Sequence, residues 1–165
     1  MTILPDDVRS VYQSMKKRCE ATVGPYENVV ICDEWKNDFK SFSEWYYKNL
    51  WKCKEPLQLD KDLLSAKDFK IYSPQTCCLL PRSLNVFLSG KKRNNGLPVG
   101  VVKTKQGYKA QVNFMDFYIT DTFDNLEDAK NFYIYNKKRY LEEFIKVIEK
   151  DAPEKIIKAL KNYQF

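Results

Sequence analysis

This sequence of 165 residues contains no histidine, although 28 of its residues are lysine or arginine. Histidine changes charge near neutral pH and is the commonest protein ligand of zinc. Its absence removes the usual general base and excludes mixed Cys/His zinc patterns. The five cysteines include no Cys-x-x-Cys pair, which favours reduced thiols packed in the core. A zinc site built from four scattered cysteines stays a weaker alternative, so zinc is not the expected cofactor.

Long apolar runs are missing as well. No segment approaches the roughly 20 apolar residues that cross a bilayer, and the start MTILPDDVRSVYQ lacks the apolar centre of a signal peptide. A hydrophobic content of 44% and an aromatic content of 15% argue against wholesale disorder. We therefore expect a folded cytoplasmic protein of one or two small domains, with no membrane partner.

Charge is distributed unevenly along the chain. The formal net charge is +6, and the window from Lys91 to Met115 contains six basic residues and no acidic one. This window alone equals the net charge of the chain, so the positive field is concentrated there. The six residues are Lys91, Lys92, Arg93, Lys103, Lys105 and Lys109.

Residue patterns predict an α+β protein in two parts. The polar, glycine-flanked segment SGKKRNNG is the clearest boundary. It divides an N-terminal part, residues 1–89, from a C-terminal part, residues 97–165, with a basic linker at 90–96. Three strand-like runs, VGVVKTK, YKAQVNF and FYITDTF, predict a three-stranded antiparallel sheet. It is expected to pack on a long helix from about Asn125 to Glu149, capped by Asp124.

The N-terminal part is predicted to hold helices and one hairpin. A first helix is expected over PDDVRSVYQSMKKRCE, with Pro5 at its first position, and a second begins at Ser41, where SFSE forms a capping box. The runs LQLDKDLL and FKIY alternate and predict a β-hairpin. Ser73 and Pro74 are expected to begin a helix, which Pro81 either kinks or follows with a second helix that carries Asn85.

The middle strand of the predicted sheet has a clean alternation. Tyr108, Ala110, Val112 and Phe114 point to one face. Lys109, Gln111 and Asn113 point to the other face, which Lys103 and Lys105 are expected to extend. Lysine, glutamine and asparagine pair with phosphates and base edges, and a sheet can read a DNA groove. The plainer alternative is an ordinary solvated face of a lysine-rich protein.

This C-terminal part resembles an APETALA-two-type DNA-binding domain. The resemblance is carried by Gly100-Val101, Gly107, Ala110, Thr122-Phe123 and Glu127-Asp128-Ala129. It implies that the sheet enters the major groove of double-stranded DNA and that Lys103, Lys105, Lys109, Gln111 and Asn113 are the readers. The sheet is poor in arginine, whose fork makes bidentate guanine contacts, so sharp sequence reading is not implied.

The N-terminal part is similar to phage-encoded proteins of the HNH endonuclease superfamily, many of which are homing-endonuclease-like and carry an APETALA-two-type domain. The similarity is carried by Cys-Asp-Glu-Trp, Leu-Asp-Lys-Asp and Tyr-Ser-Pro-x-Thr-Cys in this order. It implies a ββα-metal module in which Asp60 and Asn85 hold one Mg²⁺ or Mn²⁺ ion. Lys61, beside Asp62, stands where the family has the histidine base. Lysine is normally protonated at neutral pH and suits a phosphate clamp better than a base.

These resemblances leave two functions open for a bacteriophage protein that acts in the cytoplasm of a bacterial host. One is a metal-dependent DNA endonuclease that nicks near a site chosen by the C-terminal sheet, with Asp60, Lys61, Asp62 and Asn85 as catalytic residues. The other is a catalytically inactive relative that binds DNA as a transcriptional repressor or counter-defence protein. A third, plainer alternative is a structural or protein-binding module, and a surface hairpin with alternating charges would explain the Asp60–Asp62 triplet without chemistry.

Overall fold

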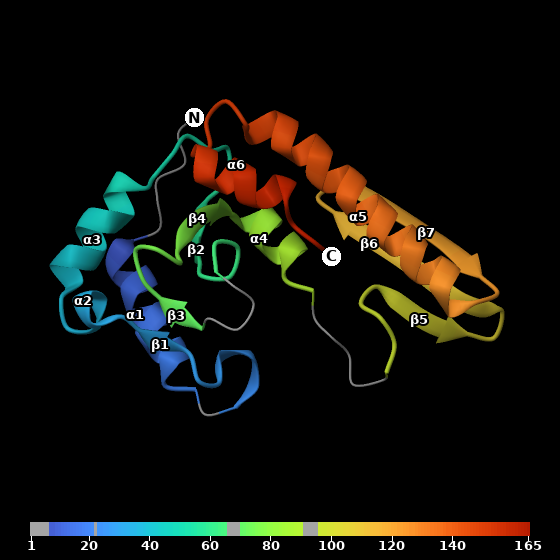
Figure 1. The fold of residues 1–165 in the computed structure, drawn as a ribbon, viewed down its shortest axis with the longest axis horizontal. Helices are drawn as coiled ribbons and strands as arrows, with labels where there is room; N and C mark the ends of the chain where they lie inside the picture. The colour runs from blue at the N-terminus through green and yellow to red at the C-terminus, as the bar shows by residue number, and fades with distance from the viewer. Residues whose placement is uncertain (1–6, 22, 66–69, 91–95) are drawn as a thin grey trace. The chain divides into compact units, whose positions relative to one another are not determined.

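The computed structural model describes residues 7–21, 23–65, 70–90 and 96–165 (Figure 1). It is an α+β structure with three small sheets. The chain forms two compact units, Met1–Arg82 with Asp151–Leu160, and Ser83–Lys150 with Lys161–Phe165. The division therefore falls before the basic segment 90–96. None of the helices in the described ranges is both long and apolar enough to cross a bilayer.

The first unit is built around aromatic side chains. Trp35, Phe42 and Tyr46 have no exposed surface, and the rings of Trp35 and Phe42 meet edge to face at 5.1 Å. Aromatic rings bury large areas and contribute strongly to packing in this geometry. The elements of this unit are α1 (Val8–Cys19), a 3₁₀ turn (Gly24–Tyr26), β1 (Val30–Ile31), α2 (Asp33–Lys36), α3 (Phe39–Lys48), β2 (Leu57–Asp60), β3 (Ile71–Tyr72), β4 (Cys78–Pro81) and α6 (Glu154–Lys161).

Helix α3 begins earlier than the capping box predicts. The side chain of Asp38 accepts hydrogen bonds from the backbone N–H groups of Lys40 and Ser41, at 2.9 and 3.2 Å. An aspartate that satisfies free N–H groups in this way is a strong N-cap. Ser41 lies inside the helix instead, and its hydroxyl donates to Glu34 Oε1 at 2.9 Å. The predicted start at Ser41 was therefore wrong.

The predicted hairpin between LQLDKDLL and FKIY is also wrong, because the two runs have other partners. Strand β2 pairs antiparallel with β4, and Asp60 lies opposite Cys78. Strand β3 pairs in parallel with β1. All four residues of β4 are buried, so this strand has the apolar surface that β2 needs as a partner.

Ser73 begins a tight turn rather than the predicted helix. Its hydroxyl accepts from the Thr76 backbone N–H at 3.2 Å, and the Cys77 N–H donates to the Ser73 carbonyl at 3.0 Å. The Thr76 hydroxyl donates to the Ile71 carbonyl at 2.6 Å. Serine and threonine favour such turns because their hydroxyls compete for backbone groups. The chain reaches α4 (Arg82–Leu88) only after Pro81.

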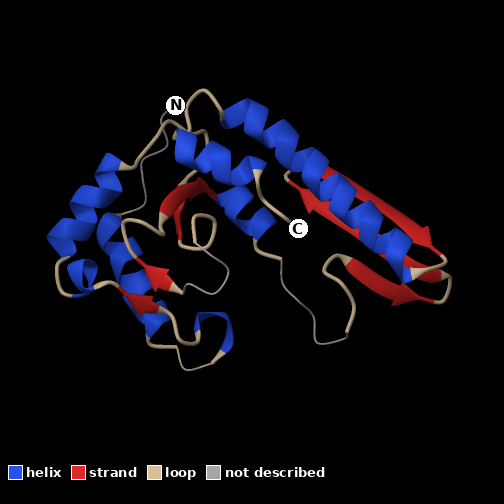
Figure 2. Ribbon diagram, viewed as in Figure 1, coloured by secondary structure: helices blue, strands red, loops and turns tan. Residues whose placement is uncertain are grey.

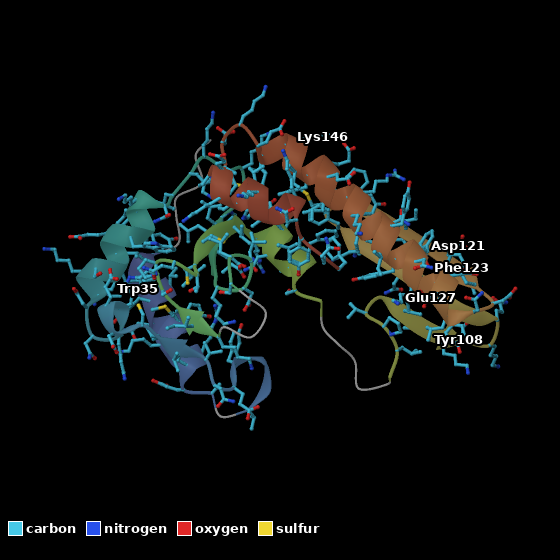
Figure 3. All side chains as sticks on the ribbon, in the orientation of Figure 1. Trp35, Tyr108, Asp121, Phe123, Glu127 and Lys146 are labelled. Atoms are coloured by element: carbon cyan, nitrogen blue, oxygen red, sulfur yellow. The ribbon has the colours of Figure 1, made fainter. Side chains whose placement is uncertain are left out.

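The second unit is a sheet covered on one face by a long helix (Figure 2). Its strands are β5 (Val101–Thr104), β6 (Gly107–Phe114) and β7 (Phe117–Phe123), in the order β5-β6-β7, and its helix α5 spans Leu126–Ile148. Tyr108 and Phe123 come from neighbouring strands and pack with Ala129 of α5 (Figure 3). The antiparallel meander thus follows the sequence prediction.

Two local features fix the ends of this sheet and helix. Asn125, rather than the predicted Asp124, caps α5, because its Oδ1 accepts from the Asp128 N–H at 2.9 Å. Gly107 opens β6 with φ = 128°, and a Cβ there would lie 2.3 Å from the Phe123 carbonyl oxygen. Only glycine fits such a position without displacing the neighbouring strand.

A buried lysine lies within the apolar stripe of α5. Lys137 is 5% exposed, and its Nζ donates to the carbonyl oxygen of Phe87 on α4. The ammonium also lies 3.5 Å from the ring centroid of Phe87 and 4.7 Å from that of Phe165. No ion pair joins Lys137 to a carboxylate among the described residues. Burial lowers the pKa of Lys137 to about 8.

This burial predicts a pH-dependent difference between the wild type and a Lys137→Met variant. Below pH 8 both the folded and the unfolded wild type carry the proton, so the full cost of burying the charge is present. Above pH 8 the folded protein loses that proton while the unfolded chain keeps it up to about pH 10.5. The stability of the wild type relative to the variant should therefore rise between pH 7 and 10.5, by on the order of 3 kcal/mol.

Denaturant unfolding of both proteins across this pH range measures the effect. Lys138→Met is the matched control, because Lys138 is the next residue of α5 and is exposed. It should show no such drift. If the difference in stability between wild type and Lys137→Met did not change with pH, the Lys137 ammonium would not be desolvated.

Candidate functional site

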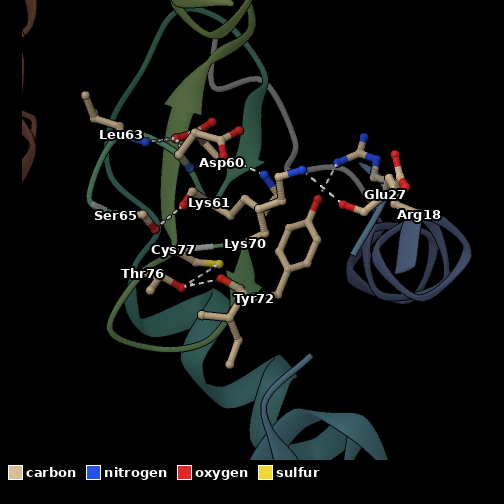
Figure 4. A network of polar contacts seen from close by, with 12 residues as sticks. Arg18, Glu27, Asp60, Lys61, Leu63, Ser65, Lys70, Tyr72, Thr76 and Cys77 are labelled. Carbon is tan, nitrogen blue, oxygen red and sulfur yellow. Dashed lines mark hydrogen bonds and ion pairs between the residues drawn. The ribbon is translucent and has the colours of Figure 1, made fainter. Parts of the chain in front are cut away.

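The Asp60–Lys61–Asp62 triplet lies where β2 ends and the chain turns (Figure 4). The Oδ1 atom of Asp60 accepts hydrogen bonds from the backbone N–H groups of Asp62 and Leu63, at 3.1 and 2.8 Å. The Ser65 hydroxyl donates to the carbonyl oxygen of Lys61 within the same turn. One carboxylate oxygen of Asp60 therefore accepts hydrogen bonds from the backbone of the turn, which is an ordinary role of aspartate in turns.

The carboxyl group of Asp60 is costly to ionise in this position. Burial raises its pKa above the usual value, and the neighbouring Asp62 carboxylate adds to the rise. The N–H groups of Leu63 and Asp62, and the charge of Lys61, act in the opposite direction. Because burial is the largest cause, the net shift favours the protonated acid. Such shifts gather at functional sites, although structural sites show them too.

Lys61 is directed into the protein while its partner stays at the surface. The side chain of Lys61 is 6% exposed, that of Asp62 is 73% exposed, and the Nζ of Lys61 donates to Asp62 Oδ1. The same ammonium lies 5.9 Å from the ring centroid of Tyr72. Lys61 is therefore engaged as a donor of hydrogen bonds.

The first unit alone does not fit the divalent metal that the HNH resemblance implies. Of the two expected ligands, Asp60 lies in the first unit and Asn85 in the second. The described ranges contain no group of three or more histidine, cysteine or acidic side chains arranged for a metal. The Lys61 ammonium pairs with Asp62, and a positive charge there repels a second cation.

Cys78, which begins β4, and Cys77, which precedes it, are equally unsuited to metal or nucleophilic chemistry. Burial raises the pKa of Cys77 to about 12 and that of Cys78 further. Thiolate, not thiol, is the form that binds metals and attacks electrophiles. Both side chains therefore act as small apolar groups in the core, beside β2.

The face of the second unit's sheet that lies away from α5 is polar except for Val102, the β5 partner of Lys109, and carries no acidic residue at its strand positions. Cross-strand partners share a face of a sheet, and Lys109 pairs with Thr122, Gln111 with Thr120, and Asn113 with Tyr118. Alternate residues of β6, from Ala110 to Phe114, are buried on the opposite face. Asp121 lies opposite Ala110, so its side chain projects on the same side of the sheet as the buried residues and not on the polar face. We call the residues Lys109, Gln111, Asn113, Tyr118, Thr120 and Thr122 the open face.

Lys103 does not extend this open face, so that expectation was wrong. Lys103 pairs with Tyr108, and its Nζ lies 5.6 Å from the Tyr108 ring centroid. It therefore projects on the side of the sheet that faces α5. Lys105 lies in the turn between β5 and β6 and is exposed. Lys91, Lys92 and Arg93 lie outside the described residues.

No local sequence pattern indicated the residues that gather around Lys61. Arg18 lies in the last turn of α1, and its Nη1 donates to the hydroxyl of Tyr72 at 3.5 Å. Lys70 precedes β3, and its Nζ donates to the carbonyl oxygen of Glu27 at 3.1 Å. These residues are far apart in the chain, and the basic end of α1 is fully explained by the helix dipole. Only the packing of α1 against the short strands brings them together.

An Asp60→Asn variant tests the cost of the buried carboxylate. Asparagine keeps the Oδ1 acceptor for Asp62 and Leu63 but cannot ionise. The pKa of Asp60 is raised in the folded state. The free-energy cost of ionising Asp60 in the fold is therefore absent at low pH, where the folded and unfolded chains are both protonated, and it is present in full above the folded-state pKa. The stability of Asp60→Asn relative to wild type should therefore rise as the pH increases from 3 to 7.

Thermal unfolding at several pH values measures this difference. Asp60→Ala is the informative second variant, because it also removes the turn acceptor and should destabilise at every pH. If the stability of Asp60→Asn relative to wild type did not rise between pH 3 and 7, the Asp60 carboxylate would not be desolvated.

Comparisons with protein-family models, curated proteins and solved structures find no match to this chain. Any function of this chain is therefore inferred from its own residues. Two surfaces are the candidates: the charged turn at Asp60–Asp62 in the first unit, and the open face of the sheet in the second.

Proposed function

We propose that this protein binds double-stranded DNA through the open face of the β5-β6-β7 sheet. The observation that carries the proposal is the register of β6 with β7, which aligns Lys109, Gln111 and Asn113 with Thr122, Thr120 and Tyr118. No strand position of this face is acidic, and carboxylates there would repel phosphates. Packing of α5 against the other side leaves the face exposed or half-exposed.

The side chains of the open face match the chemistry of a DNA groove. Glutamine and asparagine can donate to and accept from adenine together, and lysine donates to guanine or to phosphate. The Thr120 hydroxyl donates to the Ala110 carbonyl at 2.9 Å, so the Thr122 hydroxyl and the threonine methyl groups are the parts suited to phosphates, sugars and thymine. The face has a single lysine and no arginine, so it reads base edges with modest help from charge.

The residues of the two resemblances support the proposal by their structural roles. In the APETALA-two-type resemblance, Gly107 is required by its backbone angle, and Ala110 and Ala129 are fully buried where sheet and helix meet. In the HNH resemblance, β2 pairs antiparallel with β4 and α4 follows β4 directly, although β3 lies between the two paired strands in the sequence. We accordingly include an APETALA-two-like sheet domain and an HNH-like ββα element in the proposal.

The geometry of the triplet favours a DNA-binding protein without cleavage activity. A metal-dependent nuclease site needs oxygen ligands that hold a divalent cation and a group that accepts a proton. Here the buried Lys61 ammonium pairs with Asp62; it brings a positive charge without a metal, and an ammonium donates hydrogen bonds but accepts none. A repressor or counter-defence protein is the class that this arrangement supports.

Metal-dependent nicking is the second candidate, and Asp60 is the residue that favours it. Asp60 is half-buried and its pKa is raised. Carboxyl groups with raised pKa values are common in catalytic sites. When bound near Asp60, Mg²⁺ or Mn²⁺ would supply charge stabilisation at phosphate oxygens.

Substitution of the open face tests DNA binding. Lys109→Ala/Gln111→Ala should weaken binding of a labelled duplex and lower the slope of log affinity against log salt concentration by about 1, for one lost phosphate contact. Fluorescence anisotropy titrations at several salt concentrations measure both quantities.

The control removes the same side-chain types from another surface of the same unit. Lys138→Ala/Asn131→Ala lies on exposed positions of α5 and loses the same charge and one amide. It should leave affinity nearly unchanged. Equal effects of the two double variants would remove the open face from the interface.

A plasmid assay separates binding from cleavage. We expect the wild type to bind supercoiled plasmid in Mg²⁺ or Mn²⁺ without producing nicked circles. Lys61→Ala, which removes the ammonium from the triplet, and Asp60→Ala are assayed beside it. Nicking by the wild type that Asp60→Ala abolishes would instead establish the endonuclease.

A further inference from the structure

Three cationic side chains from separate segments of the first unit converge near the hydroxyl of Tyr72 (Figure 4). The guanidinium of Arg18 reaches this hydroxyl at 3.5 Å, and the Nζ of Lys61 lies 5.9 Å from the centroid of the Tyr72 ring. Lys70 points toward the same region from the start of β3 while its Nζ donates to the Glu27 carbonyl. Arg18 lies in the last turn of α1, and Lys61 follows β2.

The two outer cations of this group have neutral partners only. Arg18 donates to a hydroxyl and Lys70 to a backbone carbonyl, and neither forms an ion pair within the described ranges. Lys61 is balanced by Asp62. Like charges held close together repel one another. An anion placed between Arg18 and Lys70 would relieve that repulsion.

Tyr72 contributes a further hydrogen-bond donor at the same place. The side chain is 1% exposed, and its oxygen accepts from Arg18. The hydroxyl proton itself has no acceptor among the residues that the structure describes. Burial raises the pKa of Tyr72 to about 12, so the proton stays in place at neutral pH.

We infer that Arg18, Lys70 and the Tyr72 hydroxyl bind a phosphate group, with the Lys61 ammonium behind them. Their donors come from three segments and approach from different directions. A phosphate offers several acceptor oxygens in a tetrahedral arrangement, whereas a carboxylate offers two in one plane. The phosphate is either a phosphodiester of nucleic acid or a free phosphate group. This site lies in the first unit and uses none of the open-face residues, so it goes beyond the proposed function.

The test uses the full chain with paired substitutions. Arg18→Gln/Lys70→Gln removes both outer cations. Lys36→Gln/Lys48→Gln is the matched control, because these lysines are exposed in the same unit and the charge change is equal. Far-UV circular dichroism confirms that each variant is folded. Thermal unfolding midpoints are then compared in inorganic phosphate and in chloride at equal ionic strength, beside anisotropy titrations of a duplex.

We expect phosphate to raise the midpoint of the wild type and of the control, and to raise that of Arg18→Gln/Lys70→Gln clearly less. If the natural source is nucleic acid, Arg18→Gln/Lys70→Gln also lowers the salt slope of duplex binding by up to about 2, more than the control does. A difference seen with inorganic phosphate alone assigns the site to a free phosphate group.

Identical responses of the two double variants in both measurements would overturn the site. The result is separable from that of the open face. If the wild type bound no duplex at all, the sheet proposal would fail, while a phosphate-dependent midpoint that needs Arg18 and Lys70 would still establish this site.

Discussion

The antiparallel pairing of β2 with β4 is the constraint on which the first unit depends. Strand β4 is buried at every residue, and β2 alternates buried and half-buried side chains against it. The register ends with Asp60 opposite Cys78. Because the Asp60 carboxylate then closes the turn, the next side chain, Lys61, is directed inward and Asp62 outward. The geometry of the charged triplet is thus a consequence of strand pairing.

Sequence patterns located most elements of this unit but not their partners. Alternation in LQLD and FKIY predicted two strands, and both exist. Neighbouring short strands usually pair, but here the buried strand Cys78–Pro81 competes successfully for β2. That strand has no alternation, so its residues were assigned to a helix after Ser73. Arg18 and Lys70 could not be found from the sequence, because no local pattern brings α1 to β3.

The second unit was predictable because β6 is long enough for its alternation to be read without ambiguity. Eight residues of period two fixed the buried face and the open face. The error at Lys103 concerned register. The turn at residues 105–106 pairs Thr104 with Gly107 and therefore Lys103 with Tyr108. Lys137 was missed for another reason: a lysine within an aromatic helix stripe is expected to reach solvent, and its burial depends on α4 and the C-terminal Phe165.

The charge of the open face limits what it can do alone. Nonspecific affinity for DNA comes mainly from phosphate contacts, and each contributes a salt dependence of about 0.9 in the logarithmic slope. A face with one lysine supplies few such contacts, whereas its amides and hydroxyls suit base edges and positioning. A DNA-binding protein built on this face therefore needs phosphate contacts from other residues. Arg18 and Lys70 are cations without carboxylate partners in the described ranges, so the phosphate site proposed for them would add such contacts if its phosphate belongs to nucleic acid.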